Sequence, residues 1–223
     1  MSDNSQVKDF FSAHGTKIGV AIAVVLLIVV AAVHYFENRR KVQAAHAELM
    51  GQGMAYLYAG KSDSAYAEFE TLMANGQLEG LALAKAALLA GNLKFQNGYP
   101  DEAAVLFQKS LDFAGDVALI RSGAMMGSAA VAMEKKDYAA AVGLLEKFVK
   151  EFGSRTGNLA ERYSQEEGAD VVPTVPDALW KLTLIYREMG ENKKAQETAE
   201  KILKIYGDNA NYADKARKFL ATI

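Results

Sequence analysis

The residues of this chain that could hold a metal or attack a substrate are few and widely separated. None of the three histidines, His14, His34 and His46, has a second histidine or an acid at metal-ligand spacing on the same helical face. The chain has no cysteine, which excludes disulfides, thiolate metal sites and a cysteine nucleophile. We therefore expect no metal centre and no cofactor.

The other polar groups also fail to form a recognisable catalytic arrangement. Gly51-Gln52-Gly53 lacks the preceding strand and the following lysine and serine of a phosphate-binding loop. The acid pairs Glu68/Glu70 and Glu166-Glu167 stand among solvated polar residues, where paired acids are usually ordinary surface. No serine has a G-x-S-x-G setting. The sequence predicts that the protein is not an enzyme, and an enzyme with an unrecognised site is kept only as a third alternative.

Composition and charge are those of a globular helical protein. The chain has 223 residues, of which 51% are hydrophobic and 23% charged, and its formal net charge is −2. The near-zero charge gives no reason to expect nucleic acid or an acidic membrane surface as a ligand. Only three prolines interrupt the chain and alanine is abundant, which favours helix over sheet.

One segment near the N-terminus has the properties of a membrane span. Residues Ile18 to Phe36 contain no formal charge and, as a helix, would extend about 28 Å, close to the hydrocarbon thickness of a bilayer. Aromatic and basic residues follow at its edge, as in interfacial anchors; they are Tyr35, Phe36, Arg39, Arg40 and Lys41. The sequence thus divides into a short tail (1–17), a transmembrane helix (18–36) and a further domain (37–223).

Two other interpretations of this segment stay open. A buried core helix would need an apolar shell around it, and no other part of the chain could supply one. A cleaved signal peptide could end near Val30-Ala31-Ala32, but the apolar run is longer than a usual signal-peptide core. The orientation is also open, because three basic residues follow the span and two precede it, a margin of one that would leave the C-terminal domain in the cytoplasm.

No glycine or proline occurs between Gly19 and Gly51. Both residues interrupt helices, so their absence predicts that the membrane helix runs without a break into the first helix of the next domain. That domain would then be held close to the bilayer instead of hanging on a flexible linker.

The domain contains four copies of one pattern, an apolar helix, a short turn and a second helix with an early alanine. The turn residues are separated by 38, 38 and 54 positions; they are Gly60, Gly98, Lys136 and Gly190. Five residues after each turn stands an alanine, at Ala65, Ala103, Ala141 and Ala195. Glycine suits the left-handed conformation that ends a helix, and alanine allows a close approach of the second helix.

This pattern resembles the tetratricopeptide repeat. The last copy matches most closely, with core residues Leu182 and Tyr186, the turn at Gly190 and the small residue Ala195. The resemblance implies an all-α, tetratricopeptide-like helical-hairpin solenoid of about four repeats, with one N-terminal transmembrane helix. The longer period and Lys136 in place of a turn glycine depart from the family pattern.

Two further segments complete the domain. Residues 153–176, between the third and fourth repeats, include two prolines and three glycines and predict a long loop, either a tolerated surface insertion or a partner-binding loop. The last segment predicts a capping helix that covers the final apolar face of the solenoid. Its buried stripe would consist of Tyr212, Ala216, Phe219 and Leu220.

The resemblance also implies where the solenoid meets ligands. In tetratricopeptide arrays the first helix of each repeat lines the concave face, and counting back from each turn assigns the ligand positions. They are Met50, Met54, Leu57 and Tyr58 in the first repeat, Leu88, Asn92, Phe95 and Gln96 in the second, Met126 and Met133 in the third, and Trp180, Leu184 and Arg187 in the fourth. Four of the chain's eight methionines belong to this set, which suits a groove that adapts to varied apolar segments. The alternative is that tightly wound helices bury these residues against each other.

The whole chain is similar to the ancillary Sec-translocon subunit family, bacterial inner-membrane proteins with one span and a tetratricopeptide-like periplasmic domain. The likeness lies in Gln6-Val7-Lys8-Asp9-Phe10-Phe11, in Gly15-Thr16-Lys17, in the span and in its exit at Tyr35-Phe36. It implies a protein-binding module near the Sec translocon, single-pass in the inner membrane, whose periplasmic domain handles newly exported proteins as a chaperone or adaptor. The alternative is a scaffold for another envelope complex, in outer-membrane assembly or cell-wall synthesis. Neither nucleic acid nor a small-molecule substrate is expected as a partner.

Overall fold

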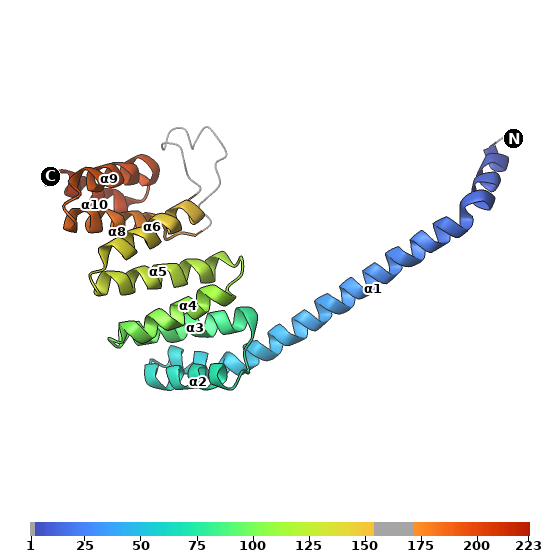
Figure 1. Cartoon of the computed structure of the whole chain (residues 1–223), viewed down its shortest axis with the longest axis horizontal. Helices are drawn as coiled ribbons and strands as arrows, with labels where there is room; N and C mark the ends of the chain where they lie inside the picture. Colours follow the sequence, from blue (N-terminus) through green and yellow to red (C-terminus); the bar gives the residue numbers. More distant parts are fainter. Residues whose placement is uncertain (1–2, 154–171) are drawn as a thin grey trace. The chain divides into compact units, whose positions relative to one another are not determined.

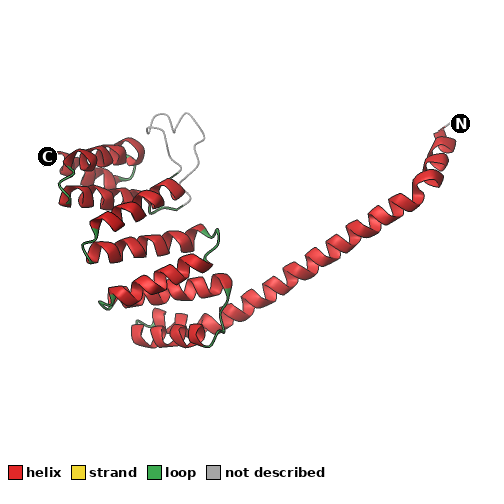
Figure 2. Cartoon of the chain, in the orientation of Figure 1, coloured by secondary structure: helices red, strands yellow, loops and turns green. Residues whose placement is uncertain are grey.

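The computed structural model describes residues 3–153 and 172–223. These residues form helices, turns and bends, and no strand occurs among them (Figure 2). The described chain divides into two compact units, Met1–Leu49 and Met50–Ile223. The all-α prediction is confirmed. Most of the predicted insertion loop lies outside the described residues.

The first unit lies within helix α1 (Asp3–Tyr58). Within the described part of the chain, α1 is the one helix long and apolar enough to cross a membrane, with a mean hydropathy of 2.4 in its apolar window and none of that window buried. The large apolar side chains from Val20 to Phe36 are all exposed, as a helix that meets lipid requires. Helix α1 also continues without a break through residues 37–42, as the absence of glycine and proline predicts.

The second unit is a stack of antiparallel helix pairs. After the end of α1 come α2 (Ser62–Ala74), α3 (Gly80–Gln96), α4 (Pro100–Phe113), α5 (Ala118–Glu134), α6 (Tyr138–Phe152), α8 (Val175–Glu188), α9 (Asn192–Tyr206) and α10 (Ala210–Leu220). From α2 onward, neighbouring helices pack on each other in chain order, and α3 also packs on α5 (Figure 1). Because each hairpin contacts the next, the unit is a solenoid. Helix α8 begins at Val175, inside the span predicted as a loop, with Pro176 in its first turn, where proline is favoured.

The four predicted turn residues share one backbone geometry. Gly60, Gly98, Lys136 and Gly190 have positive φ angles of 69°, 81°, 58° and 75°. At each turn, the N–H of this residue donates to the carbonyl three residues before it. The N–H of the following residue donates to the carbonyl five residues before itself, and the N···O distances are 2.8–3.1 Å. This is the Schellman closure of a helix. Lys136 is the one non-glycine residue with positive φ in the described chain, a conformation that costs an L-residue about 1–2 kcal/mol.

Small and large residues complement each other inside the hairpins. The alanines five residues after each turn are fully buried, and four residues further on stand Phe69, Phe107, Leu145 and Ala199, also fully buried. Seven residues before the same turns stand Gly53, Gly91, Ala129 and Thr183. The first-helix residue grows from glycine to threonine along the series as its second-helix counterpart shrinks from phenylalanine to alanine. The larger residue on one helix thus partly offsets the smaller residue on the other, as close packing requires.

The ring of Phe107 links two successive repeats through two glycines. A Cβ atom added at Gly91, in the same hairpin, would lie 2.9 Å from this ring, and one added at Gly127, on α5 of the next hairpin, would lie 2.5 Å from it. Real side chains do not approach so closely, so both positions require glycine while Phe107 keeps its place. In the first hairpin, a Cβ atom added at Gly53 would likewise lie 2.6 Å from the ring of Phe69.

The capping helix occupies the predicted place. Helix α10 packs on α9 and α8, with Ala216 and Phe219 buried and Tyr212 and Leu220 half-buried against the C-terminal core. The side chain of Asn209 caps its N-terminus by accepting from the Tyr212 N–H at 3.5 Å. The apolar end of the solenoid is therefore covered, as expected for a repeat protein.

Candidate protein-binding site

A cavity of about 430 Å³ opens among the first helices of the second, third and fourth repeats. Its lining is mostly apolar, and helices α3 and α5 together with the start of α8 form its walls. The lining residues are Asn92, Phe95, Phe107, Leu119, Ser122, Gly123, Met126, Gly127, Ala130, Val172, Pro173, Thr174, Asp177 and Lys181. This volume lies within the range of protein ligand pockets.

Glycines on α5 create the space for this cavity. Gly127 faces the ring of Phe107, and a Cβ atom at Gly123 would lie 3.0 Å from Leu88. Because these two positions have no side chain, α5 can approach α3 and α4 closely, and no side chain fills the cavity at these positions. The glycine–phenylalanine contact that joins the repeats also belongs to the wall of the cavity.

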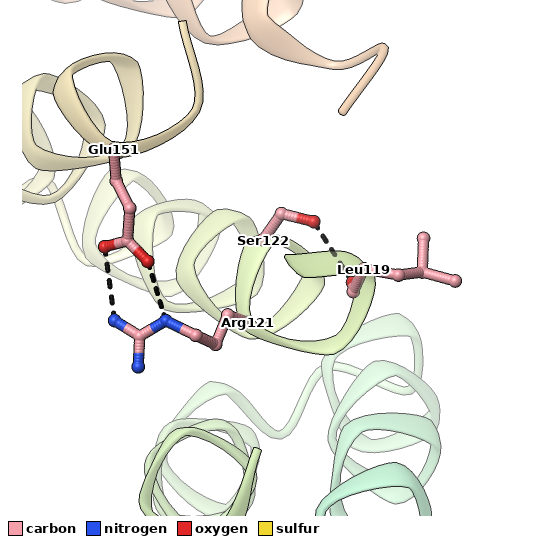
Figure 3. Close-up of polar contacts among 4 residues, drawn as sticks. All are labelled: Leu119, Arg121, Ser122 and Glu151. Carbon is pink, nitrogen blue, oxygen red and sulfur yellow. Dashed lines mark hydrogen bonds and ion pairs between the residues drawn. The ribbon is translucent and has the colours of Figure 1, made fainter. Parts of the chain in front are cut away.

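Leu119 stands at the mouth of the cavity, in the first turn of α5. It is 71% exposed, among the highest values for a large apolar side chain in the described residues. In Figure 3 its side chain points away from α5, and its backbone carbonyl accepts a hydrogen bond from the Ser122 hydroxyl at 3.1 Å. The buried Ser122 hydroxyl therefore has its hydrogen-bond partner within the helix, and the mouth of the cavity beside it is apolar.

Among the described residues that line the cavity, the two charged ones are paired with each other. Lys181 forms an ion pair with Asp177 one turn earlier on α8. Tyr212 of α10 lies close to the same carboxylate, and burial together with the charge of Asp177 raises the pKa of its hydroxyl. Because each of these two charges already has a partner, the described lining offers no unpaired charge of either sign to a ligand.

An ion pair at the flank of the cavity joins α5 to α6. The Arg121 guanidinium donates to both carboxylate oxygens of Glu151, at 2.6 and 3.2 Å (Figure 3). Both side chains are less than one-third exposed. The hydrogen bonds from Arg121 hold the pKa of Glu151 below its ordinary value, and the pKa of Arg121 is raised in return. The two-point contact fixes the N-terminal end of α5, next to Leu119 and Ser122.

A second cavity, of about 520 Å³, lies between α6, α8 and α9. It reaches core residues such as Leu182 and Tyr186, and the Tyr186 hydroxyl donates to Glu146 at 2.5 Å. Burial and this bond raise the pKa of Tyr186 far above its ordinary value, as expected for a phenol that joins two helices. We place the candidate site in the first cavity, because only that cavity contains predicted ligand positions.

The cavity brings together three of the predicted ligand residues, Asn92, Phe95 and Met126. Met54, Leu57 and Met133 are half-buried away from it, and Leu184 is half-buried on α8. Tyr58 is 86% exposed at the end of α1 and Gln96 is exposed at the end of α3. Leu88 packs in the core between repeats, against Ala84, Ala114 and Ile120.

Three further predicted positions do not line the cavity. Met50 is 5% exposed and belongs to the core. Trp180 packs edge-to-face on Phe219, with ring centroids 6.1 Å apart, and the Arg187 guanidinium lies 5.7 Å from the centre of the same ring. The capping helix therefore covers this part of the fourth repeat.

Other lining residues were absent from the sequence-based set. Leu119, Ser122, Gly123 and Ala130 lie on α5, where only Met126 and Met133 were expected, and Asp177 and Lys181 lie one turn apart on α8. The one sequence signal that could have pointed to these residues is Leu119, a large apolar residue in the first turn of α5. Within the described residues, no group of three or more acidic or histidine side chains could hold a metal ion.

The chain belongs to the family described as the tetratricopeptide repeat-like domain, whose model matches residues 8–161, more than half of its length. A tetratricopeptide repeat model matches residues 177–209 as well. No curated protein matches the chain.

Several solved structures share the fold. A tetratricopeptide repeat protein from Parabacteroides merdae is 15% identical, with a TM-score of 0.57 over 80% of this chain and 66% of that one. A MamA double mutant is 17% identical, with a TM-score of 0.54 over 75% of this chain and 79% of that one. A further MamA structure is 19% identical, with a TM-score of 0.52 over 81% and 89% of the two chains. The protein is thus a tetratricopeptide-like repeat protein, a general class of protein-interaction module that is typically not enzymatic.

The ion pair at the flank gives a pH-dependent contribution to stability. Because the pKa of Glu151 is lowered in the folded state, the pair stabilises the fold above the unfolded pKa of about 4.3, and this contribution is lost as the pH falls through the folded value. We expect Glu151→Gln to lower the urea midpoint at pH 7 and to change it progressively less below about pH 4. Urea titrations followed by circular dichroism would measure this. Glu68→Gln, an acid for which no ion pair is recorded in the described chain, is the control. An effect of Glu151→Gln that is the same at both pH values would contradict the account.

Proposed function

We propose that this protein uses the cavity between α3, α5 and α8 to bind uncharged, apolar segments of other polypeptides. The main support is that a mostly apolar cavity opens beside a leucine that is 71% exposed. Concave, mostly apolar sites with a few polar groups are the usual form of a binding pocket. The repeat family supports the general class, a module that binds proteins or peptides.

The charges favour an apolar segment over an acidic one. Among the described lining residues, the ion pair between Asp177 and Lys181 leaves no unpaired cation to hold a carboxylate. A charged peptide group would lose its hydration there without gaining a partner, which is costly. Phe95 and Met126 offer apolar contacts, and the flexible methionine adapts to side chains of different shape.

A matched pair of substitutions tests the site. Leu119 and Val105 are 71% and 68% exposed, but only Leu119 lines the cavity. We expect Leu119→Ser to weaken binding of a fluorescent peptide of alternating leucine and serine by about tenfold, because a leucine of the peptide loses its apolar contact with Leu119. Val105→Ser should leave binding unchanged.

Fluorescence anisotropy would give the Kd, and thermal unfolding would check that neither exposed substitution changes stability by more than about 0.5 kcal/mol. A peptide with glutamate in place of serine should bind more weakly than the uncharged one. Equal affinities for the two variants, or tighter binding of the acidic peptide, would sink the proposal.

We further propose that the clients are newly exported proteins met at or near the Sec translocon, where the protein acts as a chaperone or adaptor. This rests on the similarity of the tail and of the span exit to the ancillary translocon subunits, and on an apolar site suited to unfolded chains. A scaffold for another envelope complex is the second candidate, favoured if one partner in fixed stoichiometry occupies the repeats. Crosslinking in native membranes separates the two proposals. The translocon role predicts crosslinks to translocon subunits and to many clients, and the scaffold role predicts crosslinks to one partner.

The proposed orientation places residues 1–17 in the cytoplasm and the repeat unit in the periplasm of a bacterial inner membrane, with α1 as the single span. Alkaline phosphatase, which is active only after export, would be fused after Ile223, and a fluorescent protein that matures only in the cytoplasm would be fused at the same place. We expect phosphatase activity and no fluorescence. The opposite result would favour the count of basic residues on either side of the span.

A further inference from the structure

Three consecutive cations follow the apolar part of α1. Arg39, Arg40 and Lys41 are exposed, and none of them forms an ion pair within the described residues. The one acid beside them is Glu37, so the segment has a net positive charge. The net charge of −2 for the whole chain conceals this local excess of positive charge.

The helix fixes how far these cations lie from the span. Helix α1 continues through them, and at 1.5 Å per residue their Cα atoms lie about 4.5–7.5 Å beyond Phe36 along the helix. The headgroup layer of a bilayer is about 5–8 Å thick on each side of the hydrocarbon core. If Ile18–Phe36 spans the core, the three cations lie among the lipid headgroups.

The neighbouring aromatic residues mark the same level. The rings of Tyr35 and Phe36 meet edge-to-face, with centroids 5.7 Å apart, and the Arg39 guanidinium lies 5.7 Å from the centre of the Tyr35 ring. Tyrosine prefers the membrane–water interface, and a cation over its ring is partly held in place. Successive residues are about 100° apart around a helix, so the three cations cover more than half of its circumference.

We propose that Arg39, Arg40 and Lys41 form a binding site for the phosphate groups of anionic phospholipids around α1. The guanidinium group matches a phosphate with two parallel hydrogen bonds, and lysine adds a mobile point charge. In the proposed orientation these cations stand on the exported side, where basic residues are disfavoured. Headgroup binding gives a physical reason for keeping them. The inference requires that α1 spans the membrane and does not depend on client binding.

The test uses the full chain in nanodiscs of equal parts phosphatidylglycerol and phosphatidylcholine. After extraction in mild detergent, native mass spectrometry gives the ratio of the two lipids retained on the protein. We expect an excess of phosphatidylglycerol that falls about fivefold or more in the variant Arg39→Gln/Arg40→Gln/Lys41→Gln. The control Lys85→Gln/Lys201→Gln/Lys204→Gln removes the same charge from exposed positions of the repeat unit and should keep the excess.

Two further measurements use proteins in which the three positive charges at positions 39–41 are kept. Arg39→Lys/Arg40→Lys should retain most of the excess, and on the unaltered protein the excess should fall as salt is raised, because screening weakens the attraction. The proposal is overturned if the unaltered protein shows no excess, if the excess is insensitive to salt, or if the repeat-unit control loses as much as the cluster variant.

Discussion

The contact of one phenylalanine ring with two glycines determines how the central repeats pack. Phe107 is fully buried, and Gly91 and Gly127 approach its ring from two successive hairpins so closely that neither could have a side chain. Removing such a ring from a packed core costs about 3–5 kcal/mol, a large part of the about 5–15 kcal/mol that stabilises a typical domain. The spacing of α3, α4 and α5 therefore depends on this contact.

The candidate binding site follows from the same packing. Helix α5 has glycine at positions 123 and 127, so no side chain fills the cavity there. The ring of Phe107 forms part of the cavity wall. Arg121 pairs with Glu151 and Asp177 pairs with Lys181, so these charges are neutralised within the protein, and the rest of the described cavity lining is mostly apolar. A site with these properties suits a chain that has not yet buried its own apolar residues.

Local signals in the sequence were enough to predict the hairpins. The three glycine turns and the buried alanines follow from residue types at fixed spacing, the turn at Lys136 follows from the spacing alone, and the structure confirms them. The apolar run and the lack of glycine and proline likewise predicted a long unbroken α1. These features depend on neighbours a few residues apart, which a sequence displays directly.

The cavity depends on residues distant in sequence and was predicted only in part. Asn92, Phe95 and Met126 were expected because they occupy ligand positions of the repeat. Asp177 and Lys181 were not, since their place depends on how α8 packs after a long insertion, a distance over which periodicity gives no register. Trp180 and Arg187 were assigned to the groove because the sequence does not tell which face of α8 the capping helix covers.

The central claim is that other polypeptides contact the protein at the mouth of this cavity. The most direct test replaces Leu119 with benzoylphenylalanine in the full chain, irradiates native membranes during export and identifies the crosslinked proteins. The account predicts crosslinks to many newly exported chains, and few from the same photoprobe at Val105, which is equally exposed outside the cavity. Equal crosslinking from both positions, or no crosslink to any exported chain from position 119, would contradict it.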